Sequence, residues 1–160
     1  MNDARIPALG PRGEGWVAAQ AVVGVAIVAL GIVGPGWPSS VRVAAAALGI
    51  ALVVGGLAMT SWGIASLGPS LSPFPRPAAG ARFLDRGAYG HVRHPIYGGI
   101  VLGAVGWSLI RSPLVLAASA VLVVILELKS RSEESMLLAA YPEYSTYRDR
   151  VRWRFIPGVR

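Results

Sequence analysis

"WVAAQAVVGVAIVALGIV", residues 16–33, contains no charged side chain, and Gln20 is its one polar member. As an α-helix, a stretch of this length spans roughly 27 Å, close to the thickness of a bilayer's hydrocarbon core. A cleaved signal peptide has a shorter apolar run before a small-residue cleavage site, whereas this run ends in the turn sequence GPGWPSS. The stretch therefore predicts a transmembrane helix.

Three more apolar blocks follow, at residues 43–67, 96–110 and 113–126. The first is long enough to tilt or protrude, and the other two are shorter and read as a hairpin. Gly99 and Gly103 form a small-xxx-small pair suited to close helix packing. We predict an all-α integral-membrane bundle of about four transmembrane helices, with residues 1–160 as a single membrane domain and residues 16–67 as its first two helices.

Residues 68–95 interrupt the apolar pattern with prolines at positions 69, 73, 75 and 77. Proline disfavours a regular helix, so the spacing predicts a stiff extended strap rather than a fifth span. Its length and its arginine, histidine and tyrosine content favour a functional loop over a plain linker.

The fourth helix is expected to continue past the membrane through residues 127–141. The pairs Glu127–Arg131 and Lys129–Glu133 have the i,i+4 spacing of helical ion pairs. A short basic segment then begins at Pro142 and completes the predicted site region, residues 68–157.

The charge distribution indicates the orientation. The net charge is +7, and 13 of the 15 lysines and arginines fall on one side of a four-span topology, leaving Arg42 and Arg111 on the other. The positive-inside rule then places both termini in the cytoplasm. Because the charges flank apolar blocks, they indicate topology and lipid headgroups rather than nucleic acid. The chain has no cysteine, which excludes disulfides, thiolate metal sites and cysteine nucleophiles.

Polar residues that can do chemistry gather on the predicted cytoplasmic edge. Arg93, His94 and Tyr97 enter one helix, and Glu133 and Glu134 leave another. Such a cluster indicates a site open to both water and lipid. Taken singly, His94 reads as a helix cap and the glutamates as a solvated helix face. His91 and His94 lack a third ligand, so we expect no metal site.

Two stretches carry a family resemblance: GAYGHVRHPIYGG at residues 87–99 and EESMLLAAYPEYSTYRDRV at residues 133–151. Their order and spacing resemble the signatures of the isoprenylcysteine carboxyl methyltransferase family, whose members are integral-membrane enzymes that use S-adenosylmethionine. The likeness covers about residues 65–157 and includes a strap, LGPSLSPFPRP, similar to that of short bacterial members.

The resemblance implies roles for particular residues. It implies a cofactor pocket built from Tyr89, Arg93, His94, Pro95, Tyr97, Glu133 and Glu134. It implies a substrate site at the C-terminal segment, with Tyr144, Arg152 and Arg154. Arg154, which is suited to orient the acceptor, and Glu134 are the expected catalytic residues.

The implied function is S-adenosylmethionine-dependent methyl transfer to a small lipophilic acceptor at the cytoplasmic face of a bacterial inner membrane, with a carboxylate as the expected acceptor group. An amine or thiol acceptor stays open, and either would have to lose a proton. Phospholipid N-methyltransferases and membrane reductases share a similar C-terminal region and are alternatives, as is a non-enzymatic membrane subunit. The expected partners are the acceptor and membrane lipids; the oligomeric state is open.

Overall fold

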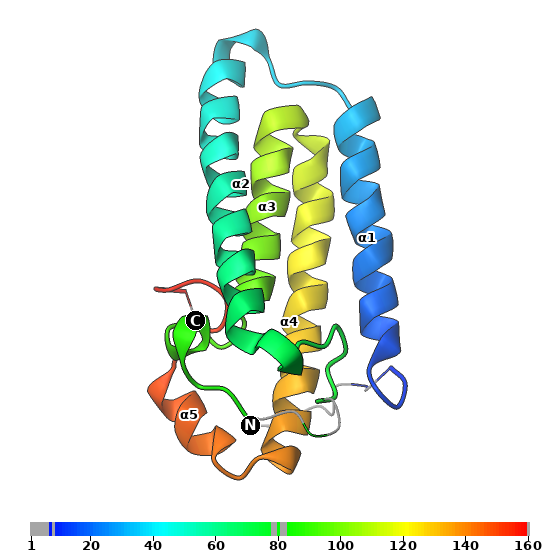
Figure 1. The fold of residues 1–160 in the computed structure, drawn as a ribbon. Helices are drawn as coiled ribbons and strands as arrows, with labels where there is room; N and C mark the ends of the chain where they lie inside the picture. The colour runs from blue at the N-terminus through cyan, green and yellow to red at the C-terminus, as the bar shows by residue number, and fades with distance from the viewer. Residues whose placement is uncertain (1–6, 8, 78–79, 81–82, 160) are drawn as a thin grey trace.

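The computed structural model describes residues 7, 9–77, 80 and 83–159. Its elements are, in order, α1 (Glu14–Val33), α2 (Ser39–Leu67), the short 3₁₀ helices η1 (Gly68–Ser70) and η2 (Gly87–Gly90), α3 (Pro95–Arg111), α4 (Leu114–Ala140) and α5 (Tyr144–Arg150). Figure 1 shows four long helices side by side, with α5 and the C-terminal segment at one end. The described residues form helices and no strand, so the predicted all-α fold is confirmed.

The outer faces of α1 and α2 are apolar. Both helices are long and apolar enough to cross a membrane, and α3 is a shorter apolar helix. Val25 of α1 and Leu57 of α2 are 70% and 63% exposed. Aliphatic side chains exposed along whole helices would be costly in water, and they fit a helical bundle that faces lipid.

The closest helix contact joins α2 to α3 through small residues. α2 buries three glycines at seven-residue spacing, Gly49, Gly56 and Gly63. A Cβ atom on Gly56 would lie 2.5 Å from the Gly99 carbonyl oxygen, and one on Gly106 would lie 2.6 Å from that of Gly49. Both members of the expected Gly99–Gly103 pair lie in this contact, because the same Cβ on Gly56 would lie 2.9 Å from the Gly103 backbone nitrogen. Seven residues make nearly two full turns, so Gly106 shares the face of Gly99.

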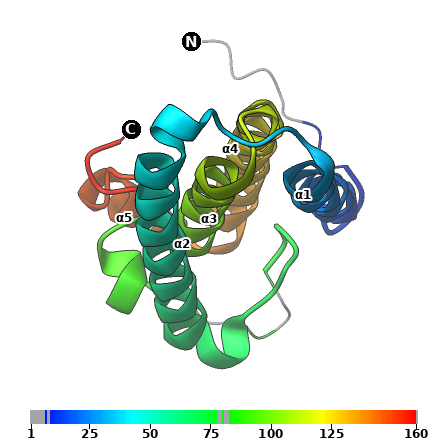
Figure 2. The ribbon, with the colours of Figure 1, turned by 90° about the horizontal axis from the view of Figure 1, so that it is seen from above.

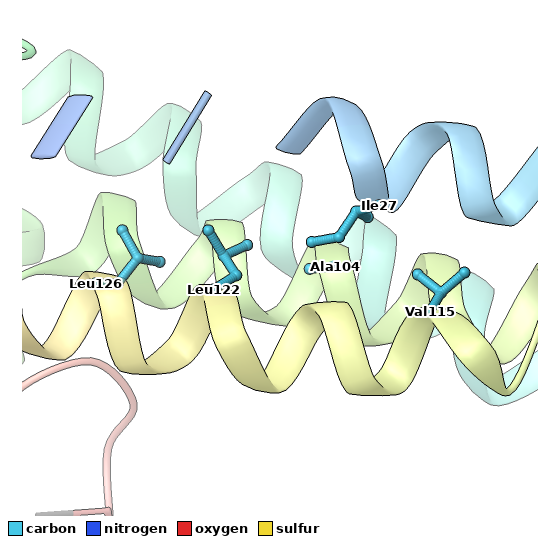
Figure 3. Packing of buried hydrophobic residues seen from close by; sticks show 5 residues of the cluster. All are labelled: Ile27, Ala104, Val115, Leu122 and Leu126. Carbon is cyan, nitrogen blue, oxygen red and sulfur yellow. The ribbon is translucent and has the colours of Figure 1, made fainter. Parts of the chain in front are cut away.

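α1 packs against α3 and α4 and lies across them from α2 (Figure 2). The Trp107 indole lies against Gly31, and its Nε1 donates a 3.2 Å hydrogen bond to the Ile27 carbonyl. Arg111 donates from Nε to the Gly31 carbonyl at 2.9 Å. The core between α1, α3 and α4 (Figure 3) consists of Ile27, Ala104, Val115, Leu122 and Leu126.

The strap after α2 crosses to the start of α1. The Arg12 guanidinium lies 4.1 Å from the centre of the Phe74 ring, and Gly13, with φ 82°, packs against Pro75. The sequence predicted an extended strap, but the strap contains a 3₁₀ turn at each end, η1 after α2 and η2 before α3. The strap lies over the end of the bundle at which α3 begins and α4 ends.

Candidate functional site

The site is at the end of the bundle where the C-terminal segment folds back onto the start of α3. The backbone N–H groups of Arg93 and His94 donate to the carbonyls of Trp153 and Arg154 at 3.0 and 2.8 Å. Pro95 occupies the first position of α3, where its missing N–H costs no helical hydrogen bond. These contacts fix Arg93 and His94 directly before the helix.

Glu134 is the centre of a buried ion network. Its Oε1 accepts hydrogen bonds from Arg93 Nε at 2.9 Å and His94 Nε2 at 3.1 Å. Arg154 Nε lies 3.3 Å from the same oxygen, and Arg154 also pairs with Glu127. Arg93 Nη1 further donates to the carbonyls of Val151 and Arg152. The predicted meeting of Arg93, His94 and the paired acids is confirmed by these distances.

The surroundings of Glu134 set its charge. Burial alone would raise its pKa, but the hydrogen bond from His94 and the charges of His94, Arg93 and Arg154 lower the pKa to about 2. The carboxylate is therefore ionised at neutral pH, and its charge holds α4 to the start of α3 and to the C-terminal segment.

Glu133, the next residue, shares His94 with Glu134, since His94 Nδ1 lies 4.0 Å from Glu133 Oε2, but its other contacts differ. The Tyr97 hydroxyl donates to Glu133 Oε2 at 2.6 Å, and the His94 ring stacks on Tyr97 with centroids 5.2 Å apart. Lys129 also lies over the Tyr97 ring, with Nζ 4.8 Å from the ring centre. The i,i+4 spacing predicted that Lys129 pairs with Glu133. Instead, Lys129 donates to Gln20 Oε1 of α1 at 2.8 Å. The predicted Glu127–Arg131 pair is present, at 2.8 Å.

Two cavities adjoin these residues. The aromatic cavity lies between the strap, α4 and α5, and six of its lining residues are rings: Phe74, Phe83, Tyr89, Tyr141, Tyr144 and Tyr147. The second cavity, of about 270 Å³, lies between α1, the end of α2, α3 and α4; among its lining residues are Val17, Gln20, Ile96, Tyr97, Ile100 and Lys129. Leu67, Ser72, Tyr89 and Glu133 line both. Glu133 and Tyr89 therefore stand where the two cavities meet.

Three phenols around the aromatic cavity, those of Tyr89, Tyr144 and Tyr147, remain protonated. Burial is the main cause that raises the pKa of Tyr89, Tyr144 and Tyr147 well above the usual value. Tyr147 donates to the Tyr89 carbonyl at 2.8 Å. The buried Tyr144 hydroxyl finds no hydrogen-bond partner among the described residues. A buried unpaired hydroxyl is costly, so this group is suited to bond a polar ligand or a water that reaches it.

The predicted site residues divide into two groups. Tyr89, Arg93, His94, Tyr97, Glu133 and Tyr144 line one or both of these cavities. Pro95, Glu134, Arg152 and Arg154 line neither. Of these four, Glu134 and Arg154 belong to the ion network, Pro95 begins α3, and Arg152 contributes its carbonyl to Arg93 while its side chain is exposed.

Sequence reasoning missed Gln20, Lys129 and Phe83. Gln20 left a signal, because it is the one polar residue in an 18-residue apolar stretch. For Lys129 the spacing predicted only a pair with Glu133, whereas the structure buries this residue beside the second cavity. Phe83 lies in the strap and forms edge-on ring contacts with Tyr144 and Tyr147.

Comparison with known protein families covers residues 87–99 in full and the second signature stretch as far as Tyr144. Residues 44–144 match the family described as phospholipid methyltransferase. The chain belongs to the phospholipid methyltransferase family. This family is related to the isoprenylcysteine carboxyl methyltransferase superfamily, so the resemblance read from the motifs is correct at that level. No curated protein matches the chain.

Membership in the phospholipid methyltransferase family implies a membrane-associated, S-adenosylmethionine-dependent methyltransferase that acts on lipid-type substrates. The match includes the strap, α3, α4 and nearly all of α2, but leaves out α1 and residues 145–160. The second cavity therefore combines walls from the family region with a wall from α1.

Proposed function

We propose that this protein methylates the amine of a lipid headgroup, with S-adenosylmethionine in the aromatic cavity and the headgroup in the second cavity. The observation that carries the proposal is the shared wall of the two cavities, to which Glu133 belongs. One cavity is rich in rings and opens beside the strap, and the other reaches the apolar side chains of α1 and α3. Donor and acceptor would thus meet at Glu133.

The lining of the aromatic cavity supports its assignment to the donor. When bound, S-adenosylmethionine supplies an electrophilic methyl group on a sulfonium. Arg93 offers a cation for its carboxylate, and the unpaired Tyr144 hydroxyl offers a hydrogen bond. The surrounding rings suit a flat adenine or a sulfonium cation. Tyr89 reaches the shared wall and would hold the donor toward the second cavity.

Glu133 and Tyr97 provide what an amine acceptor needs. A protonated amine cannot attack, so it must lose a proton before the nitrogen–carbon bond forms and the sulfur takes the bonding electron pair. The Glu133 carboxylate attracts the ammonium and can accept that proton. The Tyr97 hydroxyl, 2.6 Å from Glu133 Oε2, fixes the carboxylate at the wall. The remaining task is in-line alignment, which the rigid cavity walls supply.

A carboxylate acceptor is the second candidate. The residue expected to orient it, Arg154, lies outside both cavities and is paired with Glu127 and Glu134. A carboxylate beside Glu133 would also suffer like-charge repulsion. Lys129 is the observation in its favour, since this cation lines the second cavity.

The remaining assignments follow from charge and topology. We place the end of the bundle that carries the site at the cytoplasmic face of a bacterial inner membrane, because 13 of the 15 basic residues belong to that side. We treat residues 1–160 as one membrane domain, with residues 68–157 carrying the methyltransferase site. Family membership supports methyl transfer over a reductase or a non-enzymatic subunit.

The test is a methyl-transfer assay in lipid nanodiscs with methyl-labelled S-adenosylmethionine. Phosphatidylethanolamine and a long-chain fatty acid are offered separately, and donor binding is measured by calorimetry. We expect label in the amine lipid and its loss in Glu133→Gln, while Glu143→Gln, an exposed glutamate of the same region, behaves as wild type. Label only in the fatty acid would support the second candidate instead. Absence of donor binding would overturn both.

A further inference from the structure

Lys129 differs from the other buried cations of the site. Its residue is 3% exposed, and its ammonium donates to the neutral Gln20 amide and lies over the Tyr97 ring. Within the described part of the chain, no carboxylate lies within the 4.0 Å ion-pair distance of its Nζ. Arg93 and Arg154, by contrast, share Glu134. A buried charge that is in no ion pair is costly, so this ammonium is suited to pair with an anionic group of a ligand.

Gln20 holds this ammonium in place from α1. A polar side chain within an apolar spanning stretch is expensive in lipid and marks a functional position. Here the Gln20 side chain and Val17 line the second cavity together with Lys129. Because α1 lies outside the region that matches the family, this part of the cavity is contributed by the chain's own N-terminal helix.

Lys129 and Glu133 stand one helical turn apart and both line the second cavity. Residues with this spacing have Cβ atoms about 5–6 Å apart on a helix surface. Tyr97 lies between them, with its ring beside Lys129 and its hydroxyl on Glu133. The cavity thus presents a cation and an anion at a short, braced separation. Its volume of about 270 Å³ compares with roughly 30 Å³ for one water, so it can hold a group of several heavy atoms.

We propose that Lys129, positioned by Gln20, binds the phosphate of a phospholipid headgroup whose amine lies at Glu133. The two-carbon linker of ethanolamine separates phosphate and amine by a distance comparable to the roughly 5–6 Å between Cβ atoms one helical turn apart. Lysine binds phosphate as a point charge, so a single ammonium suffices for this role. The inference rests on the proposed function in one respect, which is that the headgroup in this cavity is the methyl acceptor. It adds a specificity residue, Lys129, and a positioning residue, Gln20.

The test measures binding apart from turnover. Calorimetry in detergent follows short-chain phosphatidylethanolamine, a phosphate-free long-chain amine and a long-chain carboxylate with wild type, Lys129→Met and Gln20→Leu. Loss of a charged hydrogen bond, about 1.5–3 kcal/mol, predicts about 10- to 100-fold weaker phospholipid binding in Lys129→Met. Gln20→Leu should lose less, because the ammonium remains. Both should bind the phosphate-free amine as wild type does, and the exposed Arg148→Met should match wild type throughout.

Stability, donor affinity and a second variant separate loss of the phosphate contact from loss of the fold. Lys129→Met should retain the thermal transition and the donor affinity of wild type, and Lys129→Arg should restore phospholipid binding in part. Unchanged phospholipid binding in Lys129→Met would overturn the inference. The inference would also fail if Lys129→Met weakened binding of the long-chain carboxylate but not of the phospholipid. If phospholipid binding depends on Lys129 but no amine lipid is methylated, the inference stands and the proposed function fails. If an amine lipid is methylated equally well by wild type and Lys129→Met, the proposed function stands and the inference fails.

Discussion

Glu133 and Glu134 are neighbours in α4, yet they belong to two different regions of the site. Glu134 lies in the ion network with Arg93, His94 and Arg154, where its Oε1 is shared by three basic side chains. Glu133 lies on the wall of both cavities, where its one hydrogen-bonding partner among the described residues is Tyr97. Consecutive residues in a helix point about 100° apart, so one step in sequence separates the two environments. We infer that the network holds the site together and the wall performs the chemistry.

The largest effect should come from breaking the network. Glu134→Gln leaves the buried Arg93 guanidinium without its carboxylate partner, which should destabilise the fold by about 3–5 kcal/mol. Chemical unfolding in detergent measures this change, and donor binding should weaken only as the folded population falls. A variant with wild-type stability and no donor binding would show that Glu134 contacts the cofactor instead.

Acid should weaken the same network without a mutation. The pKa of Glu134 is about 2 in the folded protein, below its ordinary 4.5, because hydrogen bonding and positive charges outweigh burial. A lowered pKa stabilises the fold fully above pH 4.5, and that contribution disappears as the pH falls toward 2. The loss amounts to about 3 kcal/mol. Unfolding free energies measured across this window should show a steeper decline in wild type than in Glu134→Gln, and equal slopes would contradict the assignment.

The cavity wall should respond in the opposite way. Glu133→Gln removes the group that attracts the amine and accepts its proton, so kcat should fall about 100-fold or more. Its unfolding free energy should change by less than about 1 kcal/mol, since the side chain is partly exposed and has no buried arginine to leave unpaired. Equal losses of stability in the Gln variants at 133 and 134 would erase the distinction between the two regions.

The sequence predicted the helices better than their contacts. Residues 16–33 and 96–110 became α1 and α3 with ends shifted by one or two positions, because an uninterrupted apolar run is a local signal. The order of the motifs also predicted the meeting of Arg93 and His94 with the paired acids.

Other contacts left no such pattern. Lys129 bonds Gln20 across 109 positions, and Arg154 reaches Glu127 from a segment folded back by its backbone hydrogen bonds. Spacing rules describe neighbours on one helix, so they assigned Lys129 to Glu133 and left Gln20 without a role. Which of two partners a flexible lysine takes depends on the neighbouring helix, and that information is not local.

The smallest predicted effect concerns the bond between Tyr97 and Glu133. Tyr97→Phe keeps the ring beside His94 and Lys129 but removes the hydroxyl that fixes the Glu133 carboxylate. The loss of one charge-assisted hydrogen bond predicts a fall in kcat/KM of about tenfold, with donor affinity unchanged. A double-mutant cycle with Glu133→Gln isolates the interaction, because the Tyr97 substitution should cost almost nothing once the carboxylate is absent. Additive losses would mean that Tyr97 contacts the acceptor independently, and the wall would then have two separate polar contacts in place of one braced carboxylate.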